Sequence, residues 1–371
     1  MKLAIFLDVL STHQEGLCNA FYDRLGNDFK TVLFGKLPQY RIDAGFTDLS
    51  DKYSYTVVLP EDKVVRNELL KDVVNWADVG IVGGVTDRIF DSFLAQGKKC
   101  FLFSERFYKK GTWRCIIPST LKSVRRRIRE DNNFAVLCAS AFLPYGLRIS
   151  GYKGKMLQWG YFPNIEIDSY NRGGGTPISI LWTGRFIKWK HPETCIRIAE
   201  KLKRDDIEYR LTIVGYGELK DNLLKMISDK GLVGYVDLKD AMPPQEIHKL
   251  MGLSDIFLAT SDYHEGWGVV VNEAMTAGCT VVASSAMGAV PFMIRDGENG
   301  FSCRWNDYNK YYSCVKQLIE DSDLRNLVSQ NAIATMTTQY SPSNAVDCFC
   351  RYLEGEQFAS GIMSEAEVRK R

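Results

Sequence analysis

The sequence predicts an α/β protein built from two doubly wound parallel sheets, and three observations support this class. Short apolar runs of strand length alternate with amphipathic stretches of helix length, which favours parallel strands joined by right-handed crossovers. Glycine turns follow several of the apolar runs, as at 83–84 and 215–217. The chain has 371 residues, 45% of them hydrophobic, which is enough for two cores.

The first half of the chain supplies one such sheet. Strands are predicted from its apolar runs at 3–7, 31–34, 55–59, 79–83, 100–103, 134–140 and 156–159. A loop at 11–14 precedes a helix that we expect from about Glu15 to Leu25. The glycines at 83–84 do not complete a Gly-x-Gly-x-x-Gly fingerprint, which disfavours a nicotinamide-dependent oxidoreductase.

The second half repeats strand–helix units after a glycine-rich, apolar-poor linker at 169–177. Strands are predicted at 178–182, 209–214, 236–239, 255–260 and 279–283. Helices are predicted at 191–203, 218–230 and 244–251, and others from about residues 268, 308, 323 and 343. The linker divides the chain into domains at 1–168 and 169–342.

Composition narrows the compartment and the partners. The net charge of +2 gives no global attraction to nucleic acid. Ten cysteines without a Cys-x-x-Cys pair indicate a reducing cytosol, where thiols act as small core residues. Asp8 interrupts the apolar start of the chain, which favours a first buried strand over a signal peptide. No run reaches the ~18 apolar residues of a membrane span.

The stretch 264–275 is the point around which the second half is organised. Gly266 and Gly268 allow a tight turn, and a helix beginning near Gly268 would aim free backbone N–H groups at a phosphate. Glu265 and Glu273 would face the same ligand, because helical side chains lean toward the N-terminus. Carboxylates accept hydrogen bonds from sugar hydroxyls, so the pattern suits a nucleotide sugar. An ordinary βαβ turn with two solvated glutamates fits it equally.

Three motifs resemble one enzyme family. Glu265 and Glu273 are spaced Glu-x7-Glu within Glu-Gly-Trp-Gly-x4-Glu-Ala-Met, and Arg185 and Lys190 follow a strand in the order Thr-Gly-Arg-Phe-x3-Lys. A third motif, Ile-Val-Gly-Tyr-Gly at 213–217, supplies the next strand and glycine turn. Together they resemble glycosyltransferase family 4, the group 1 glycosyl transferases. These are retaining enzymes of GT-B fold, in which two Rossmann-like domains face a cleft.

The resemblance implies sugar transfer from a nucleoside-diphosphate sugar without a metal or other cofactor. It puts Arg185 and Lys190 on the diphosphate, Glu265 on the donor-sugar hydroxyls and Glu273 on the ribose. The other donor contacts that it implies are Gly184, Gly215, Tyr216, Met242, Gly266, Trp267, Gly268 and Val269. A UDP-sugar is favoured, with a GDP-sugar as the alternative. Relatives often carry the segment Gly-Gly-x-Pro-Glu. The corresponding segment of this chain, 288–292, has Phe292 in place of the glutamate, so the specificity for the sugar stays open.

The resemblance also assigns the two domains. It makes 1–168 the acceptor-binding domain and 169–342 the donor-binding domain, and it implies that the final segment at 343–371 packs back on the first. Val346, Phe349 and Tyr352 recur at helical spacing in this segment. They give its helix one apolar face that must be buried.

Two side chains of the first domain are candidates for the acceptor. His13 lies in the expected loop after the first strand, and Glu105 follows the strand at 100–103. Ligands bind at such carboxyl ends in open α/β sheets. His13 either lines the acceptor pocket and takes part in catalysis or is an ordinary loop residue. Glu105 either contacts the acceptor or pairs with Arg106.

A basic segment in the first domain indicates a membrane surface. Aromatic and cationic residues are interleaved at 107–114, and a basic helix with one apolar face follows. The cations are Lys109, Lys110, Arg114, Lys122, Arg125, Arg126, Arg127 and Arg129. Such a cluster suits an anionic leaflet, with Phe107, Tyr108 and Trp113 at the headgroup level. A solvated helix face is the alternative, and nucleic acid does not fit the balanced charge of the chain.

We therefore expect a cytoplasmic enzyme that is peripheral on the inner membrane face. Its acceptor is expected to be a saccharide, in particular a lipid-linked one. The expected pathway is cell-surface polysaccharide or glycan biosynthesis. Two other functions stay open: a nucleotide-sugar hydrolase or epimerase of the same fold, and a non-catalytic sugar-nucleotide-binding subunit. Asp321-Ser322-Asp323 has the Asp-x-Asp form of a metal–diphosphate motif. It precedes a helix, where these residue types are ordinary caps.

Overall fold

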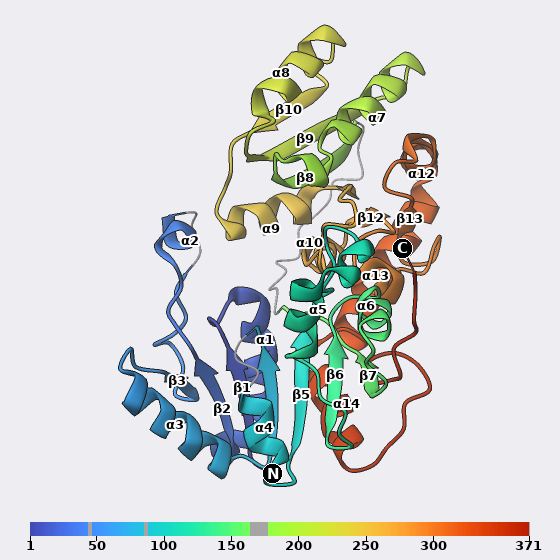
Figure 1. The fold of residues 1–371 in the computed structure, drawn as a ribbon. Coiled ribbons are helices and arrows are strands. Elements are labelled where there is room, and N and C mark those ends of the chain that lie inside the picture. The colour runs from blue at the N-terminus through green and yellow to red at the C-terminus, as the bar shows by residue number, and fades with distance from the viewer. Residues whose placement is uncertain (44–46, 85–87, 164–176, 371) are drawn as a thin grey trace. The chain divides into compact units, whose positions relative to one another are not determined.

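The computed structural model describes residues 1–43, 47–84, 88–163 and 177–370. It divides into two compact units, Met1–Asn164 with Tyr340–Arg371 as unit 1 and Ile165–Gln339 as unit 2 (Figure 1). Each unit contains one sheet whose paired strands are parallel. This confirms the predicted class of two parallel-sheet α/β domains. Apart from Pro177, the predicted linker lies outside the described residues.

The sheet of unit 1 has the strand order β3-β2-β1-β4-β5-β6-β7. Its strands are β1 (Leu3–Leu7), β2 (Phe29–Leu33), β3 (Thr56–Val58), β4 (Val79–Gly83), β5 (Lys99–Ser104), β6 (Phe134–Cys138) and β7 (Lys155–Gln158). The order reverses between β1 and β4, and the carboxyl ends at such a reversal are where open α/β sheets bind ligands. Asp8 follows β1 and Gly84 follows β4 at this position.

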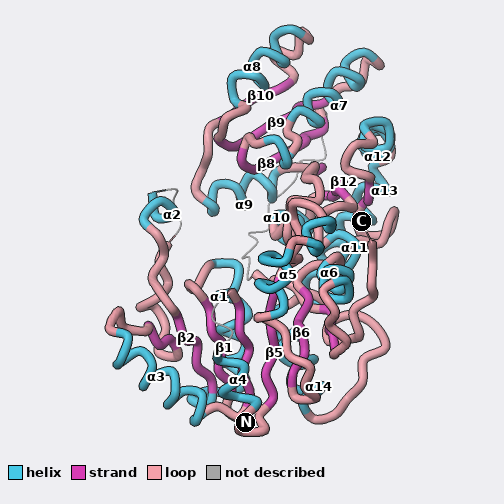
Figure 2. Tube along the Cα trace, in the orientation of Figure 1, coloured by secondary structure: helices cyan, strands magenta, loops and turns pink. Residues whose placement is uncertain are grey.

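Helices accompany the strands of unit 1 (Figure 2). They are α1 (Thr12–Leu25), α2 (Gln39–Asp43), α3 (Lys63–Trp76), α4 (Arg88–Leu94), α5 (Pro118–Arg125), α6 (Leu143–Ile149) and α14 (Pro342–Leu353), with 3-10 turns η1 (Gly26–Asp28) and η2 (Thr112–Ile116). The start of α1 differs from the expectation, because the Ser11 carbonyl oxygen accepts hydrogen bonds from Gln14 N and Glu15 N at 2.9 and 3.0 Å. His13 therefore lies in the first helical turn and not in a loop.

The final helix, α14, belongs to unit 1 and packs against α1. Ser341 caps it by accepting a hydrogen bond from Asn344 N at 3.2 Å. The buried ring of Phe349 meets Phe21 of α1 edge-on at 5.6 Å and Phe101 of β5 at 5.0 Å between ring centres. A buried phenylalanine of this kind contributes about 1.5–3 kcal/mol through the hydrophobic effect.

The sheet of unit 2 has the strand order β10-β9-β8-β11-β12-β13. Its strands are β8 (Ile178–Arg185), β9 (Tyr209–Tyr216), β10 (Val236–Lys239), β11 (Ile256–Ala259), β12 (Thr280–Ser284) and β13 (Phe301–Cys303). The order reverses between β8 and β11. The end of β8 at Arg185 therefore neighbours the loop that follows β11 and contains Glu265.

The helices of unit 2 are α7 (Glu193–Arg204), α8 (Lys220–Asp229), α9 (Pro244–Leu253), α10 (Val270–Thr276), α11 (Val290–Met293), α12 (Tyr308–Glu320) and α13 (Ser322–Thr338), with the 3-10 turn η3 (Lys188–Lys190). Ile180, Ile213 and Leu258 of the central strands lie in one buried core with residues of α7 and α12. All ten cysteines of the chain are free, and each except Cys115 is buried. This confirms their predicted role as small core residues.

Candidate functional site

The ends of β8 and β9 approach each other more closely than strands with side chains could. Gly184 pairs with Gly215, and a Cβ placed on Gly215 would lie 1.8 Å from the Gly184 carbonyl oxygen. A Cβ on Gly217 would lie 2.6 Å from the Phe186 carbonyl oxygen, and its φ of 142° also favours glycine. These glycines leave bare backbone at the sheet edge where Arg185 emerges.

Two cations gather around one indole ring just after β8. The guanidinium carbon of Arg185 lies 5.5 Å from the centre of the Trp189 ring, and the Lys190 ammonium lies 4.8 Å from it. Arg185 is exposed, whereas Lys190 is half-buried. The structure thus brings together the two cations that the sequence predicted. It adds Trp189, which sequence reasoning missed although its position directly before Lys190 was a signal.

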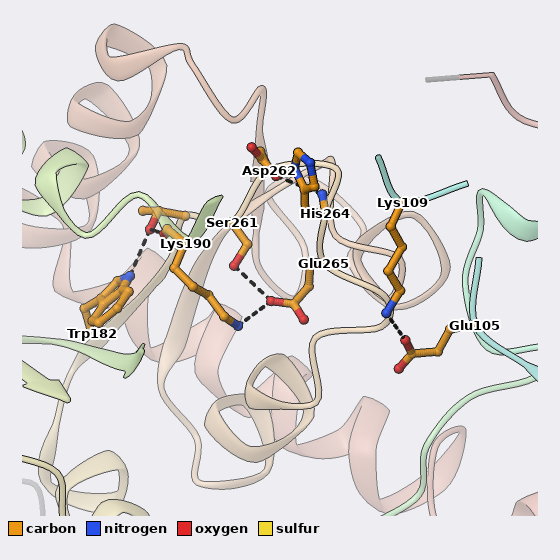
Figure 3. Close-up of polar contacts among 9 residues, drawn as sticks. Glu105, Lys109, Trp182, Lys190, Ser261, Asp262, His264 and Glu265 are labelled. Atoms are coloured by element: carbon orange, nitrogen blue, oxygen red, sulfur yellow. Dashed lines mark hydrogen bonds and ion pairs between the residues drawn. The ribbon is translucent and has the colours of Figure 1, made fainter. Parts of the chain in front are cut away.

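Lys190 is held from another direction by a carboxylate. Its ammonium forms an ion pair with Oε2 of Glu265, and the same oxygen accepts a hydrogen bond from Ser261 Oγ at 3.0 Å (Figure 3). The side chains of Lys190 and Glu265 are only 17% and 13% exposed. Water screens such a pair less than a surface pair, and removing one partner would leave the other charge poorly solvated. Ser261 is a further residue that the sequence did not indicate.

Hydrogen bonds fix the segment that carries Lys190. Thr260 Oγ1 donates to the Lys190 carbonyl oxygen at 2.7 Å and accepts from the Trp182 indole at 2.8 Å (Figure 3). The Asp262 N–H donates to the Trp189 carbonyl oxygen at 2.9 Å. The end of β8 is therefore tied to the loop after β11, and the two segments that provide the ion pair are held together.

His191 adds a second set of contacts at this position. Its Nδ1 lies 2.9 Å from Glu193 Oε1 and its Nε2 lies 3.3 Å from Asp262 Oδ2. Its ring stacks on Trp305 with centres 4.8 Å apart. Burial acts to lower the pKa of His191, but the hydrogen bonds to Asp262 and Glu193 outweigh it and raise the pKa to about 9. His191 is therefore a cation at neutral pH.

Asp262 is ionised in the same cluster. Burial opposes its ionisation, but hydrogen bonds from His191 and from His264 hold its pKa below the usual range. The His264 backbone N–H and ring Nδ1 both lie 2.8 Å from Asp262 Oδ1. Lys190, Glu265, Asp262 and His191 together form a compact group of alternating charges.

The glycine turn follows this group. Gly268 has a φ of 92°, a backbone conformation that favours glycine, and a Cβ there would also lie 2.4 Å from Met287 Cε. Trp267 is 1% exposed, and its indole N–H donates to Asn272 Oδ1 at 2.8 Å. Its side chain thus anchors the turn in the core. Within the predicted donor residues 266–269, backbone groups and not large side chains would meet a ligand.

The remaining predicted donor residues come from neighbouring elements of unit 2. Glu273 lies in α10, and its Oε1 is 3.6 Å from Nε2 of His248 in α9. Tyr216 is 53% exposed at the end of β9, and Met242 is half-buried between β10 and α9. His248 is another residue that sequence reasoning missed, because its contact with Glu273 depends on the packing of two helices.

In unit 1, Glu105 follows β5 as expected. Its Oε2 pairs with Lys109 at 2.6 Å (Figure 3), and its Oε1 accepts a hydrogen bond from the Tyr161 hydroxyl at 3.3 Å. Burial, reinforced by Glu105, raises the pKa of Tyr161. The Arg106 guanidinium lies over the Phe142 ring at 4.9 Å. Glu105 thus has Lys109 as its ion-pair partner and Arg106 contacts an aromatic ring.

Asp8 is an additional candidate at the strand reversal of unit 1. Gly84 has a φ of 78°, which favours glycine, and a Cβ there would lie 2.4 Å from Asp8 Oδ2. Burial raises the pKa of Asp8, and the positive charge of Arg127 partly opposes this rise. His13, in the first turn of α1, is half-buried. In the sequence, Asp8 was apparent only as a break in an apolar run.

The basic segment differs from the expectation in three respects. The helix α5 ends at Arg125, because the chain beyond it forms a tighter turn in which Arg127 N bonds to the Val124 carbonyl oxygen at 2.9 Å. Arg129 pairs with Asp91 at 2.6 Å. Tyr108 is buried, with its hydroxyl 2.6 Å from Ser150 Oγ, so it cannot insert at a headgroup level.

A smaller basic patch remains on the surface. Its exposed members are Lys110, Trp113, Ile116, Lys122, Arg125 and Arg126. Trp113 is 60% exposed and Ile116 is 78% exposed. A shallow pocket on α5 lies among residues of the patch, between Leu121, Lys122 and Arg126.

Within residues 1–43, 47–84, 88–163 and 177–370, no group of three His, Cys, Asp or Glu side chains is arranged to hold a metal ion. Asp321 caps α13 by accepting a hydrogen bond from Leu324 N at 2.9 Å, which is the predicted role. No helix in the described part of the chain is long and apolar enough to cross a membrane.

Comparison with known proteins agrees with this geometry. Residues 166–335 match the family described as glycosyl transferases group 1. The lipopolysaccharide core biosynthesis glycosyltransferase LpsE of Rhizobium meliloti is 29% identical over 174 residues, 47% of this chain and 49% of that protein. A D-inositol 3-phosphate glycosyltransferase of Corynebacterium aurimucosum is 28% identical over 160 residues, 42% of this chain and 38% of that protein. The match spans about half the length of these relatives or less.

A solved structure covers more of the chain. The crystal structure of Anabaena Alr3699/HepE in complex with UDP aligns with a TM-score of 0.71 at 17% identity. The alignment covers 96% of this chain and 100% of that one. At this identity the likeness shows the fold alone, and it confirms the GT-B class that the sequence predicted.

Proposed function

We propose that this chain, whose residues 166–335 belong to the glycosyl transferases group 1 family, is a retaining glycosyltransferase that uses a nucleoside-diphosphate sugar. One observation carries the proposal: the Lys190–Glu265 ion pair, with Arg185 beside it, lies at the strand reversal of unit 2. Arginine and lysine are the side chains that bind diphosphates, and a carboxylate suits sugar hydroxyls. Unit 2 is accordingly the donor-binding domain.

In this proposal the donor replaces one partner of the ion pair. Its diphosphate takes Lys190 together with Arg185, and Glu265 turns to the hydroxyls of the donor sugar. The acceptor oxygen then bonds to the anomeric carbon on the face from which the phosphate leaves. The bond between that carbon and the phosphate oxygen breaks, and the acceptor proton passes to the leaving phosphate. The two cations stabilise the charge that grows there, so no metal is required.

Further observations support a choice of donor base and of acceptor. A UDP-sugar is favoured, because the aligned Anabaena protein was crystallised with UDP, and a GDP-sugar is the alternative. Glu273 would bind the ribose, with Tyr216 and Met242 beside the base. The acceptor is a saccharide, lipid-linked in the favoured case, bound in unit 1 near His13 and Glu105. Asp8 joins this acceptor set as an exposed carboxylate at the carboxyl end of β1.

The activity test is incubation with UDP- and GDP-sugars and candidate acceptors, followed by product analysis. Transfer with retained anomeric configuration supports the proposal, whereas free sugar alone would indicate a hydrolase and an isomerised donor an epimerase. Binding without turnover would indicate a non-catalytic subunit. Arg185→Ala should slow transfer by ~10²-fold or more, and EDTA should have no effect. A variant with wild-type turnover would contradict the role of Arg185.

The basic patch supports a peripheral location on the cytoplasmic face of a membrane, in a pathway of cell-surface polysaccharide synthesis. Each cation contributes about 1 kcal/mol near an anionic leaflet, and Trp113 and Ile116 can enter the headgroup layer. The test is sedimentation with anionic vesicles at low salt. A variant with Lys122→Glu, Arg126→Glu and Trp113→Ala should stay in the supernatant, and one with Lys63→Glu and Lys71→Glu on α3 should still sediment. If wild type does not sediment, the membrane location is wrong.

A further inference from the structure

His191 has a backbone conformation that its residue type rarely adopts. Its φ is 51°, in the left-handed region. Among the residues that the structure describes, His191, Asp206 and Met363 are the non-glycine residues with positive φ. Glycine would fit at each of them without steric cost. A side chain kept in such a conformation beside a functional lysine must contribute an interaction that outweighs the strain.

The side chain of His191 joins three elements of unit 2. Glu193 of α7 binds Nδ1 at 2.9 Å, Asp262 after β11 lies 3.3 Å from Nε2, and Trp305 after β13 stacks on the ring. Ionised carboxylates only accept hydrogen bonds, so both ring nitrogens must carry protons. His191 is thus an imidazolium between two carboxylates, and neither nitrogen is available to a phosphate.

We propose that the imidazolium of His191 is a positioning residue that holds Lys190 and Glu265 in the arrangement that receives the donor diphosphate. It acts on both partners through Asp262. The Asp262 backbone N–H holds the carbonyl oxygen of Trp189, next to Lys190. Asp262 also follows Ser261, whose hydroxyl donates to Glu265.

This role rests on the proposed donor site. It makes donor binding at that site depend on the proton that gives the His191 ring its charge. The charged groups that face the ring are Glu193 from α7 and Asp262 from the loop after β11. His264 contacts Asp262 through Oδ1, and Lys190 directly precedes His191 in the chain. Trp305, from the loop after β13, is neutral. When the ring loses its proton near pH 9, Glu193 and Asp262 face each other without the cation between them.

The first experiment compares UDP affinity in wild type and His191→Asn by calorimetry. Asparagine tolerates the left-handed conformation but carries no charge. At about pH 7 the variant should bind UDP about tenfold more weakly, the loss typical of removing a residue that orients a ligand-binding side chain. At about pH 10 the two affinities should converge, because wild-type His191 is then neutral. Ionisation of UDP itself cancels in the ratio.

A matched control separates the contacts of His191 with Glu193 and Asp262 from a general disturbance of the loop after β11. His264 binds the same Asp262 carboxylate from a more exposed position, with 44% of its side chain accessible. His264→Asn should therefore leave the UDP affinity within about twofold of wild type, as expected for an exposed side-chain contact. Equal losses in the two variants, or a ratio that does not change with pH, would overturn the positioning role.

A second readout does not depend on UDP. Acetic anhydride labels lysines at rates that fall when the amine is paired and protected, and mass spectrometry resolves Lys190 from the others. His191→Asn should raise the Lys190 rate by about threefold or more, and His264→Asn should not. If wild type binds neither UDP nor GDP, the proposed function fails, and the labelling result alone decides the role of His191. Unchanged labelling of Lys190 in His191→Asn would refute it.

Discussion

Raising the pH through about 9 should destabilise unit 2, because His191 contributes to folding only as a cation. The pKa of its imidazole is raised from 6.5 to about 9 in the folded protein. A raised pKa gives stability that is fully present below 6.5 and is lost as the pH rises through the folded value. The shift corresponds to about 3 kcal/mol at 1.36 kcal/mol per unit. Because the side chain keeps 16% exposure, about 2 kcal/mol is the better expectation.

The assay is an NMR titration of the ring carbons in protein with labelled histidine. The chain has four histidines, so four resonances are expected, and the His191→Asn variant identifies one of them. That resonance should titrate near 9, and Asp262→Asn should lower its pKa by removing one carboxylate. A thermal melt should show unit 2 losing ~4–8 °C between about pH 6.5 and pH 10, at 2–4 °C per kcal/mol. His191→Asn should lose much less.

Two results would refute this reasoning. If the His191 resonance titrates near 6.5 in the folded protein, the carboxylates do not hold its proton. If Asp262→Asn leaves a pKa near 9 unchanged, another group is the cause, and the link from His191 to Glu265 through Asp262 fails.

Two further predictions concern the same unit. Lys190→Met and Glu265→Gln should each lower the free energy of unfolding by ~1–3 kcal/mol, because each change leaves a partly buried charge without its partner. The double variant should lose less than the sum of the two. Additive losses in thermal melts would show that the pair is not coupled. Gly215→Ala should lower the melting temperature and abolish UDP binding, since its Cβ would lie 1.8 Å from the Gly184 carbonyl oxygen. The control Gly35→Ala, whose Cβ would meet only an oxygen at 3.9 Å, should be tolerated. A wild-type melting temperature in Gly215→Ala would contradict the close approach of β8 and β9.

The sequence alone predicted the fold class, which the structure confirms, and part of the proposed donor site. Apolar runs such as 178–182 and 279–283 are strands because their residues are buried on both faces, a property that local composition records. Arg185, Lys190 and Glu265 were predicted because the motifs that contain them resemble those of glycosyltransferase family 4. Gly215 and Gly268 lie in the same motifs. The φ of 92° at Gly268 is a local backbone requirement, whereas the requirement at Gly215 comes from the Gly184 carbonyl oxygen of the neighbouring strand.

Tertiary structure alone decided which of these groups touch and which charges are neutralised. His191 meets Asp262 across 71 positions of the chain, and Lys190 meets Glu265 across 75. Arg129 of the basic segment is paired with Asp91. Sequence periodicity reports which face of an element is buried, but not which distant element covers it. The strand reversal between β8 and β11 brings these partners together, and that order is a property of the packed sheet.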